Sequence, residues 1–214
     1  MFKNLNTDPS KKPWLLGELG ELSHTKVSSS EFKYGKDAEI FGQAEPADYI
    51  YQVIEGAVRT HKLLSDGCRQ IGAFHFPGDI FGLENEDLHR FTAEAIVDTT
   101  VRLVKRRSCD GSKSPNMTTD NLQHVENHML LLGRKNSRER VAAFLLEMHG
   151  RLAAADVVAL PMSRCDIADY LGLTLETVSR ELAAFQRKGY LRVAGPLKRE
   201  FIVLNSAGLI ELDR

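Results

Sequence analysis

Residues 163–205 read SRCDIADYLGLTLETVSRELAAFQRKGYLRVAGPLKREFIVLN, and this stretch decides the fold of the C-terminal part of the chain. Ser163 is typical of a helix N-cap, and Asp166, three residues later, suits the first turn of the same helix. We therefore expect a helix to begin here, with its inner face formed by Ile167, Ala168 and Leu171.

A second helix is expected to follow at once. Gly172 breaks the first helix and Thr174 caps the next one. A small Ala168, a glycine four residues later and Val178 six residues beyond it are typical of a helix-turn-helix. The alanine lets the two helices approach closely, and the glycine permits the tight turn. The expected inner face of the second helix is Leu175, Val178 and Leu182.

The segments on both sides of this motif complete a DNA-binding domain. LRVAG (191–195) and EFIVLN (200–205), with Gly195-Pro196 after the first, predict a β-hairpin wing. Upstream, Asn136 or Ser137 is expected to cap a helix, and VVALPM (157–162) to form a short strand. Residues 136–214 are thus expected to form a winged helix-turn-helix.

The outer face of the second helix carries the chemistry that reads DNA bases. Glu176, Ser179 and Arg180 are spaced i, i+3 and i+4, so they share one face. Arginine can bond guanine bidentately, glutamate can accept from cytosine, and serine can approach thymine or a phosphate. The alternative is an ordinary solvent-exposed Glu–Arg pair. Because the start of the first helix approaches the DNA backbone in this motif, the expected backbone contacts are Ser163, Arg164 and Thr174.

The N-terminal half has a different pattern, in which short strand-like runs are separated by glycines. VRTHKLL (58–64) and CRQIGAFHF (68–76) flank Ser65-Asp66-Gly67, and an Asp-Gly between such runs is a strong hairpin signal. Residues 27–116 are therefore expected to form a small β-barrel or sandwich. Residues 1–26 are polar at first, and we expect a flexible tail and a short helix there.

Between these regions, residues 117–135 are expected to form a helix with an apolar seam. The seam residues follow one another at spacings of three, four and three, the a/d pattern of a coiled-coil dimer. A helix lying on its own domain is the alternative. The expected dimer interface is Leu122, Val125, Met129 and Leu132.

Composition restricts the remaining classes of function. Residues 134–214 hold 13 Lys and Arg against 10 Asp and Glu, whereas residues 1–133 hold 15 against 19. No stretch approaches the ~20 apolar residues of a membrane helix, and no signal peptide is evident, which favours a cytoplasmic protein. The three cysteines lack the spacing of a zinc or iron–sulfur site. No nucleophile–base pair or phosphate-binding loop suggests an enzyme.

At this point the sequence resembles the Crp/Fnr superfamily of transcription regulators. LGLTLETVSRELAAFQRKGYL (171–191) is similar to the family's recognition region, LLLGRKNSRERVAAFLLEM (130–148) to the junction of its dimer helix and DNA domain, and residues 27–116 to its cyclic-nucleotide-binding β-roll. The resemblance implies an α+β fold: a β-roll, a long dimerisation helix and a C-terminal winged helix-turn-helix.

The E-x-x-S-R pattern at 176–180 is the variety of the Fnr and FixK branches. It implies that a homodimer binds double-stranded DNA at TTGAT…ATCAA palindromes, with base contacts from Glu176, Ser179 and Arg180. The FixK branch activates genes for low-oxygen respiration and nitrogen fixation. In this family exposed β-roll loops contact RNA polymerase, so the Leu64–Cys68 hairpin is a candidate for that contact.

Departures from the family pattern lead us to expect no cofactor or effector. Residues 1–40 contain no cysteine for an Fnr-type cluster. Glu84 and Arg90 stand near, but not at, the positions that hold the cyclic phosphate, and His89-Arg90-Phe91 replaces the Arg-Ser pair. A regulator gated by cyclic nucleotide or haem is the alternative. His75 and His89 do not suffice for a haem proposal, and His124 and His128 are interpreted as solvated helix residues, not metal ligands.

Cys165 is a candidate redox switch. It lies in the first turn of the first helix of the motif, where the helix N-terminus and Arg164 both favour the thiolate. Helical geometry places it about 110° from the centre of the core face, so we expect it to be accessible. A sulfinate or sulfonate formed there by oxidation would place a permanent negative charge near a DNA phosphate. The alternative is an inert small residue at a helix start.

Overall fold

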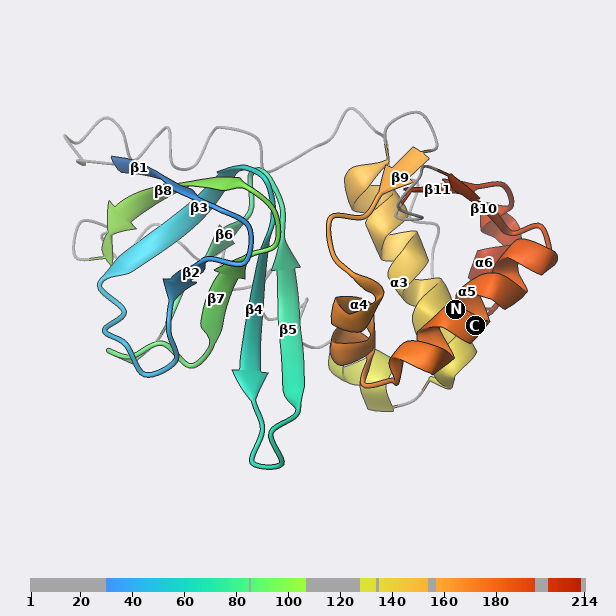
Figure 1. The fold of residues 1–214 in the computed structure, drawn as a ribbon, viewed down its shortest axis with the longest axis horizontal. Coiled ribbons are helices and arrows are strands. Elements are labelled where there is room, and N and C mark those ends of the chain that lie inside the picture. Colours follow the sequence, from blue (N-terminus) through green and yellow to red (C-terminus); the bar gives the residue numbers. More distant parts are fainter. Residues whose placement is uncertain are drawn as a thin grey trace, which may run out of the picture. The chain divides into compact units, whose positions relative to one another are not determined.

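The computed structural model describes residues 30–84, 86–106, 128–133, 135–153, 157–194 and 200–212 (Figure 1). The chain divides into two compact units, residues 1–58 with 74–110 and residues 59–73 with 111–214. The elements are β1 (Ser30–Tyr34), β2 (Glu39–Phe41), β3 (Tyr49–Glu55), β4 (Val58–Leu63), β5 (Arg69–His75), β6 (Ile80–Phe81), β7 (Thr92–Ala95), β8 (Thr99–Lys105), α3 (Ser137–Leu152), β9 (Val157–Ala159), α4 (Arg164–Leu171), α5 (Leu175–Arg187), β10 (Leu191–Ala194), β11 (Glu200–Val203) and α6 (Ser206–Leu212).

The glycine-punctuated region forms the expected β structure. One four-stranded sheet has the order β1-β8-β3-β6 and another the order β2-β7-β4-β5. In the first sheet β8 pairs antiparallel with both β1 and β3, with Val101 opposite Phe32 and Val53. Gly56, with φ +91°, makes the turn after β3, where a Cβ would lie 2.4 Å from Thr99 Oγ1. Only glycine tolerates that close approach with a positive φ.

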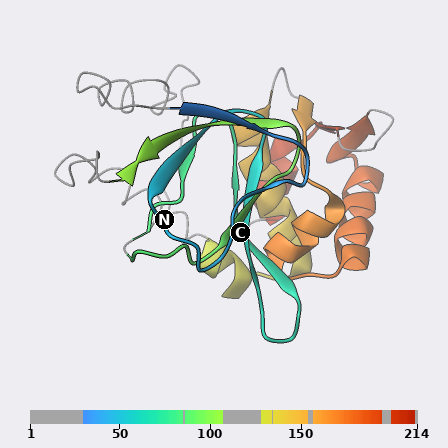
Figure 2. The ribbon, with the colours of Figure 1, turned by 60° about the vertical axis from the view of Figure 1, so that its left-hand side comes forward.

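The hairpin signal at Asp66-Gly67 is confirmed. Gly67 has φ +81°, Cys68 N–H donates to Asp66 Oδ1 at 2.9 Å, and the turn joins β4 to β5. Both views of the ribbon show these strands side by side as a long hairpin (Figures 1 and 2). Every residue of the turn from Leu64 to Cys68 is exposed.

The core of the β-roll is aromatic and β-branched. Strand residues that alternate inward pack together because successive side chains point to opposite faces of a sheet. The buried cluster comprises Phe41, Tyr51, Val53, Val58, Phe81, Ala93 and Val101.

The C-terminal region forms the expected helices and wing. α3 begins at the Asn136 N-cap, where Asn136 and Glu139 form a capping box. The wing strands β10 and β11 pair antiparallel, and the VVA segment adds β9 to the far side of β11, so the wing is a three-stranded sheet. Among the described residues, no helix has the length and apolar character needed to cross a bilayer.

Candidate DNA-reading site

The first helix of the motif, α4, begins and ends as its sequence predicts. Ser163 and Asp166 cap each other: Asp166 N–H donates to Ser163 Oγ at 3.1 Å, and Ser163 N–H donates to Asp166 Oδ2 at 2.9 Å. Gly172 ends the helix in the left-handed region with φ 60°. Ile167, Ala168 and Leu171 are buried as expected. These caps fix the position of the residues that begin α4.

The second helix, α5, begins at Thr174, whose Oγ1 accepts from Thr177 N–H at 3.2 Å. Val178 and Leu182 are buried as expected, and Phe185 extends the same face. The prediction for Leu175 is wrong, because its side chain is 45% exposed. Helical side chains lean toward the N-terminus, so a residue in the first turn projects beyond the helix start instead of onto its packed face.

The outer face of α5 presents two of the three expected base-reading residues to solvent. Glu176 is exposed, and the Arg180 side chain is 65% exposed with Nε 3.7 Å from Glu181 Oε1. Glu181 is itself buried and accepts from Arg138 Nε at 3.1 Å. Arg180 is therefore loosely paired and available to a ligand in front of the helix.

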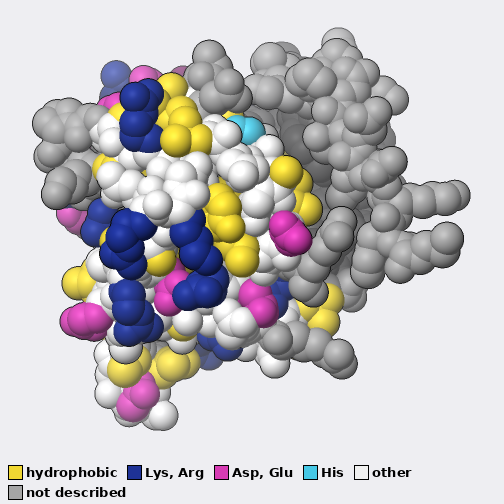
Figure 3. Space-filling view, turned by 90° about the vertical axis from the view of Figure 1, so that its right-hand side faces the viewer, with side chains coloured by type: hydrophobic (Ala, Val, Ile, Leu, Met, Phe, Trp, Pro, Cys, Tyr) yellow, Lys and Arg dark blue, Asp and Glu magenta, His cyan; other side chains and the backbone are white. Residues whose placement is uncertain are grey.

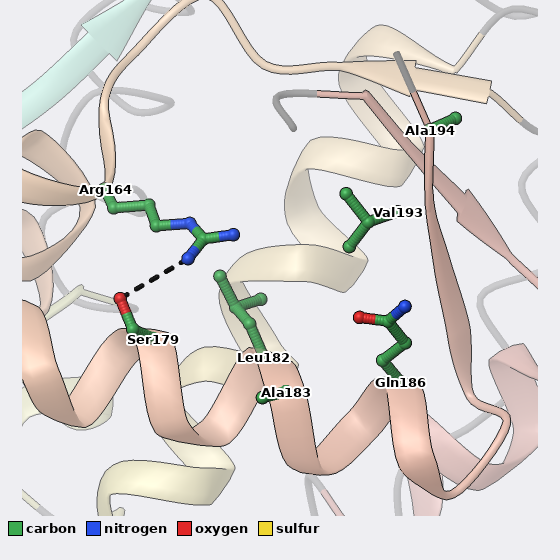
Figure 4. Close-up of a pocket in the computed structure, with 7 residues that line it drawn as sticks. All are labelled: Arg164, Ser179, Leu182, Ala183, Gln186, Val193 and Ala194. Atoms are coloured by element: carbon green, nitrogen blue, oxygen red, sulfur yellow. Dashed lines mark hydrogen bonds between the residues drawn. The ribbon is translucent and has the colours of Figure 1, made fainter. Parts of the chain in front are cut away.

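Ser179, the third of these residues, is half-buried beside Arg164. Arg164 Nη1 donates to Ser179 Oγ at 3.5 Å, a long hydrogen bond (Figure 4). The two side chains border a pocket of about 390 Å³ between α5 and the wing strand β10. Its other lining residues are Leu182, Ala183, Gln186, Val193 and Ala194. Arg164 thus lies next to the reading face, and not only at the start of α4.

Lys and Arg side chains gather on the face shown in Figure 3. The exposed basic residues on α5, just after it and on β10 are Arg180, Arg187, Lys188 and Arg192. Positive charge of this kind is the main source of non-specific affinity for the phosphate backbone.

Cys165 is exposed and free, as its helical position predicts. Thr174 is exposed, whereas Ser163 and Arg164 are half-buried. The expected backbone contacts and the candidate redox residue therefore all lie at the two helix starts of the motif.

Half of the expected dimer seam can be located. Leu122 and Val125 lie outside the described residues. Residues 128–133 are helical, and within them Met129 is 65% exposed and Leu132 half-buried. An exposed methionine is compatible with a partner surface, although Leu131, not a seam residue, is the one buried.

The interpretation of His128 as a solvated residue is wrong. Its ring stacks on Tyr170 of α4 with centroids 4.2 Å apart, and its Nε2 lies 2.9 Å from the Tyr170 carbonyl oxygen. The i, i+4 spacing of His124 and His128 could not predict this contact, because Tyr170 lies 42 residues from His128 in the sequence. His124 lies outside the described residues, among which no metal-binding group of three side chains occurs.

In the β-roll, the two charged residues considered for phosphate binding pair with each other. Arg90 Nε donates to Glu84 Oε2 at 2.8 Å, and Arg90 N–H donates to Glu84 Oε1 at 3.1 Å. The Arg90 side chain is 64% exposed, so it lies outward, away from the core.

His89, beside them, is 2% exposed and stacks on Phe41 with ring centroids 3.6 Å apart. Its Nδ1 lies 3.8 Å from Glu84 Oε1. Burial lowers the pKa of His89 below its ordinary value, although Glu84 opposes that shift. A neutral aromatic ring therefore fills this part of the roll.

Comparison with known proteins agrees with both halves of this description. Residues 31–110 match the cyclic nucleotide-binding domain family, and residues 139–212 match the Crp-like helix-turn-helix domain family. The nitrogen fixation regulation protein FixK of Rhizobium meliloti is 41% identical over 160 residues, which cover 74% of this chain and 76% of that protein. The transcriptional activatory protein AadR of Rhodopseudomonas palustris is 38% identical, covering 81% and 79%.

A solved structure, FixK2 from Bradyrhizobium japonicum, superposes with a TM-score of 0.83 at 56% identity, covering 88% of this chain and 98% of that one. The chain belongs to the Crp/Fnr family. Its helix-turn-helix makes it a DNA-binding transcription regulator of the FixK type.

Proposed function

We propose that this chain binds TTGAT…ATCAA-like palindromes as a homodimer and activates nitrogen-fixation or low-oxygen genes without a small-molecule effector. The observation that carries the proposal is the outer face of α5, where Glu176 and Arg180 are exposed and Ser179 lies beside them. FixK of Rhizobium meliloti, by its name a nitrogen fixation regulator, supports the choice of target genes.

In this proposal Arg180 bonds guanine, Glu176 accepts from cytosine, and Ser179 contacts thymine or a phosphate. Leu175 joins them, since an exposed leucine at the start of a recognition helix can pack against a thymine methyl group. Ser163, Arg164 and Thr174 hold the DNA backbone. The exposed basic residues near the end of α5 add affinity that is independent of sequence.

A palindrome requires two recognition helices about 34–36 Å apart, so the function needs a dimer. The exposed Met129 supports an interface along the expected seam. A buried, unpaired charge in that interface would cost several kcal/mol. Met129→Glu and Val125→Glu should therefore run as monomers in light scattering and lose palindrome binding. If both remain tight dimers, the interface lies elsewhere.

Action without an effector is supported by the region around His89. The candidate phosphate-binding groups Glu84 and Arg90 are paired with each other, and the His89 ring occupies the core. Purified protein with no additive should therefore bind its site and activate transcription in vitro. A strict requirement for cyclic nucleotide, haem or iron would instead favour the ligand-gated alternative.

Two further parts of the proposal concern control and output. Oxidation of the Cys165 thiol by two equivalents of peroxide to a sulfinate would place a negative charge at the start of α4 and weaken DNA binding. The exposed Leu64–Cys68 turn would contact RNA polymerase. Leu64, 45% exposed, and Leu63 just before the turn, 62% exposed, form an apolar surface there.

The decisive experiment is a binding assay on a palindrome and on versions permuted at each position. The proposal predicts that the unmodified TTGAT half-site binds best and that Arg180 variants lose discrimination at one guanine per half-site. Binding without preference among the permuted sites would contradict it.

A further inference from the structure

The hairpin β4–β5 carries two arginines and a glutamine that contact α4 within the second unit. Arg59 lies on β4, and Arg69 and Gln70 lie on β5, about a hundred residues before their partners on α4. None of these three residues belongs to the reading face of the motif. Their contacts run from the first turn of α4 to its last.

At the first turn of α4, both arginines converge on Asp166. Arg59 Nη1 lies 3.2 Å and Arg69 Nη2 2.7 Å from the same oxygen, Asp166 Oδ1. The other oxygen, Oδ2, accepts from Ser163 N–H and Oγ–H. Burial opposes ionisation of Asp166, but the Ser163 hydrogen bonds and the two arginines more than offset it, so its pKa lies below the ordinary value.

At the last turn of α4, the hairpin contacts both side chain and backbone. Arg69 Nε donates to Asp169 Oδ2 at 2.9 Å. Gln70 Nε2 donates to the Asp169 carbonyl oxygen at 2.8 Å and reaches that of Tyr170 at 3.4 Å. Carbonyls in the last turn of a helix have no partner within it, so Gln70 supplies one from outside.

The Asp166 side chain therefore contacts both the start of its own helix and the β4–β5 hairpin. Through Ser163 it fixes the start of α4, and through Arg59 and Arg69 it joins that start to the hairpin. The Asp166 side chain is only 5% exposed, and a carboxylate this buried that loses its cations is strongly destabilised. The helix start would then shift or loosen, and the residues beside it, Arg164 and Cys165, would move with it.

We propose that Arg59, Arg69 and Gln70 are positioning residues for DNA binding, which hold α4 in the orientation that the operator requires. The inference rests on the proposed backbone contacts at the start of α4. None of the three residues needs to touch DNA. Through these contacts the β4–β5 hairpin affects the affinity of the helix-turn-helix for DNA.

The test measures operator affinity as a function of salt for Arg69→Ala, with Lys62→Ala as matched control. Lys62 is exposed on the same hairpin, and its loss removes the same charge. We expect Arg69→Ala to bind at least tenfold more weakly than Lys62→Ala, with an unchanged slope of log affinity against log salt. A phosphate contact would instead lower the slope by about one per protomer.

Asp169→Asn sharpens the test, because it separates positioning from direct electrostatics. Removing a negative charge from a DNA-binding motif should raise affinity if charge alone matters. The positioning role instead predicts that Asp169→Asn lowers operator affinity. It also predicts that the double variant Arg69→Ala/Asp169→Ala loses no more operator affinity than Arg69→Ala alone. Arg69→Lys keeps the charge but lacks the planar guanidinium that contacts both aspartates. Its operator affinity should therefore lie between those of the parent and Arg69→Ala.

Several outcomes would overturn the proposal: an affinity of Arg69→Ala within twofold of the control, tighter binding by Asp169→Asn, or a reduced salt slope. Loss of thermal stability with unchanged affinity would show a purely structural role. Gln70→Ala keeps every ion pair and provides a measurable variant if Arg69→Ala does not fold. Arg180→Ala should lose base preference regardless, so failure of this inference is distinct from failure of the proposed function.

Discussion

In the β-roll around His89, aromatic rings pack against one another, whereas the charged side chains on the outer face of α5 are exposed to solvent. Phe41 lies 5% exposed between the rings of Tyr51 and His89, with centroids at 5.0 and 3.6 Å. Arg180, by contrast, is 65% exposed and only 3.7 Å from one carboxylate oxygen. The first region is held by the packing of its rings, and neither ring nitrogen of His89 has a hydrogen-bond partner among the described residues. The second region holds N–H donors that are available to a ligand.

We therefore expect the packed region to determine the stability of the fold and the exposed face of α5 to determine DNA recognition. A change in the packed roll removes contacts that the folded chain makes with itself, so it should lower the free energy of unfolding. A change on α5 removes contacts that form only with DNA, so it should lower affinity. Each prediction below tests whether the two regions are separable in this way.

The largest effect is expected from Arg180→Ala. Loss of a bidentate guanine contact costs about 1–3 kcal/mol, and a symmetric dimer doubles this to roughly 2–6 kcal/mol of operator binding. Thermal stability should be unchanged, and Arg180→Lys should not restore base preference. Arg187→Ala, which removes another exposed charge near the end of α5, should weaken binding to all sites alike. Unchanged selectivity of Arg180→Ala on permuted sites would show that another residue reads the guanine.

Phe41→Ala is the converse change, in the packed roll. Truncating a buried phenylalanine costs about 3–5 kcal/mol of unfolding free energy, measured by chemical denaturation. Phe32→Ala is the control, because Phe32 is 47% exposed and should cost much less. The folded fraction of Phe41→Ala should keep the base preference of the parent. Altered base preference would mean that the two regions are coupled.

Peroxide treatment is expected to have a smaller effect, on the DNA side only. Oxidation of the exposed Cys165 adds a charge whose repulsion from a phosphate at about 4 Å is ~1 kcal/mol in water. Two protomers then lose at least about tenfold in affinity. Cys165→Ser should resist peroxide, and Cys165→Asp should bind weakly from the start. Cys68→Ser, at a second exposed cysteine, should stay sensitive. Peroxide sensitivity of Cys165→Ser would locate the oxidised group elsewhere.

The smallest expected effect is a pH dependence of stability due to His89. Burial lowers its pKa in the folded chain, whereas the unfolded chain keeps a value near 6.5. The unfolded state then binds more protons below about pH 6.5, so this contribution is fully present above that pH and lost as pH falls. His89→Phe keeps the stacking and removes the titration, so its stability should fall less between pH 7 and pH 5. Equal slopes for the two proteins would mean that His89 is not held neutral.

The sequence by itself determined the local structure of this protein. The caps at Ser163 and Thr174, the helix break at Gly172 and the Asp66-Gly67 turn were all predicted, and each is present. A cap at Asn136 or Ser137 was also predicted, and the structure places it at Asn136. Their hydrogen bonds join residues two to four positions apart, so the residues that decide them stand together in the sequence. The shared face of Glu176 and Arg180 also depends only on residues four positions apart, which is why the sequence predicted it.

Only the tertiary structure decided the contacts between distant segments. Arg69 and Asp169 are separated by 100 positions and His128 and Tyr170 by 42, and no periodicity relates them. The exposure of Leu175 likewise depended on where the packed face of α5 begins, not on its spacing. The ring of His89 became a core residue because Phe41 and Tyr51 surround it. Periodicity assigns a side chain to a face, but burial depends on which segment covers that face, and this is set by the packing of the whole chain.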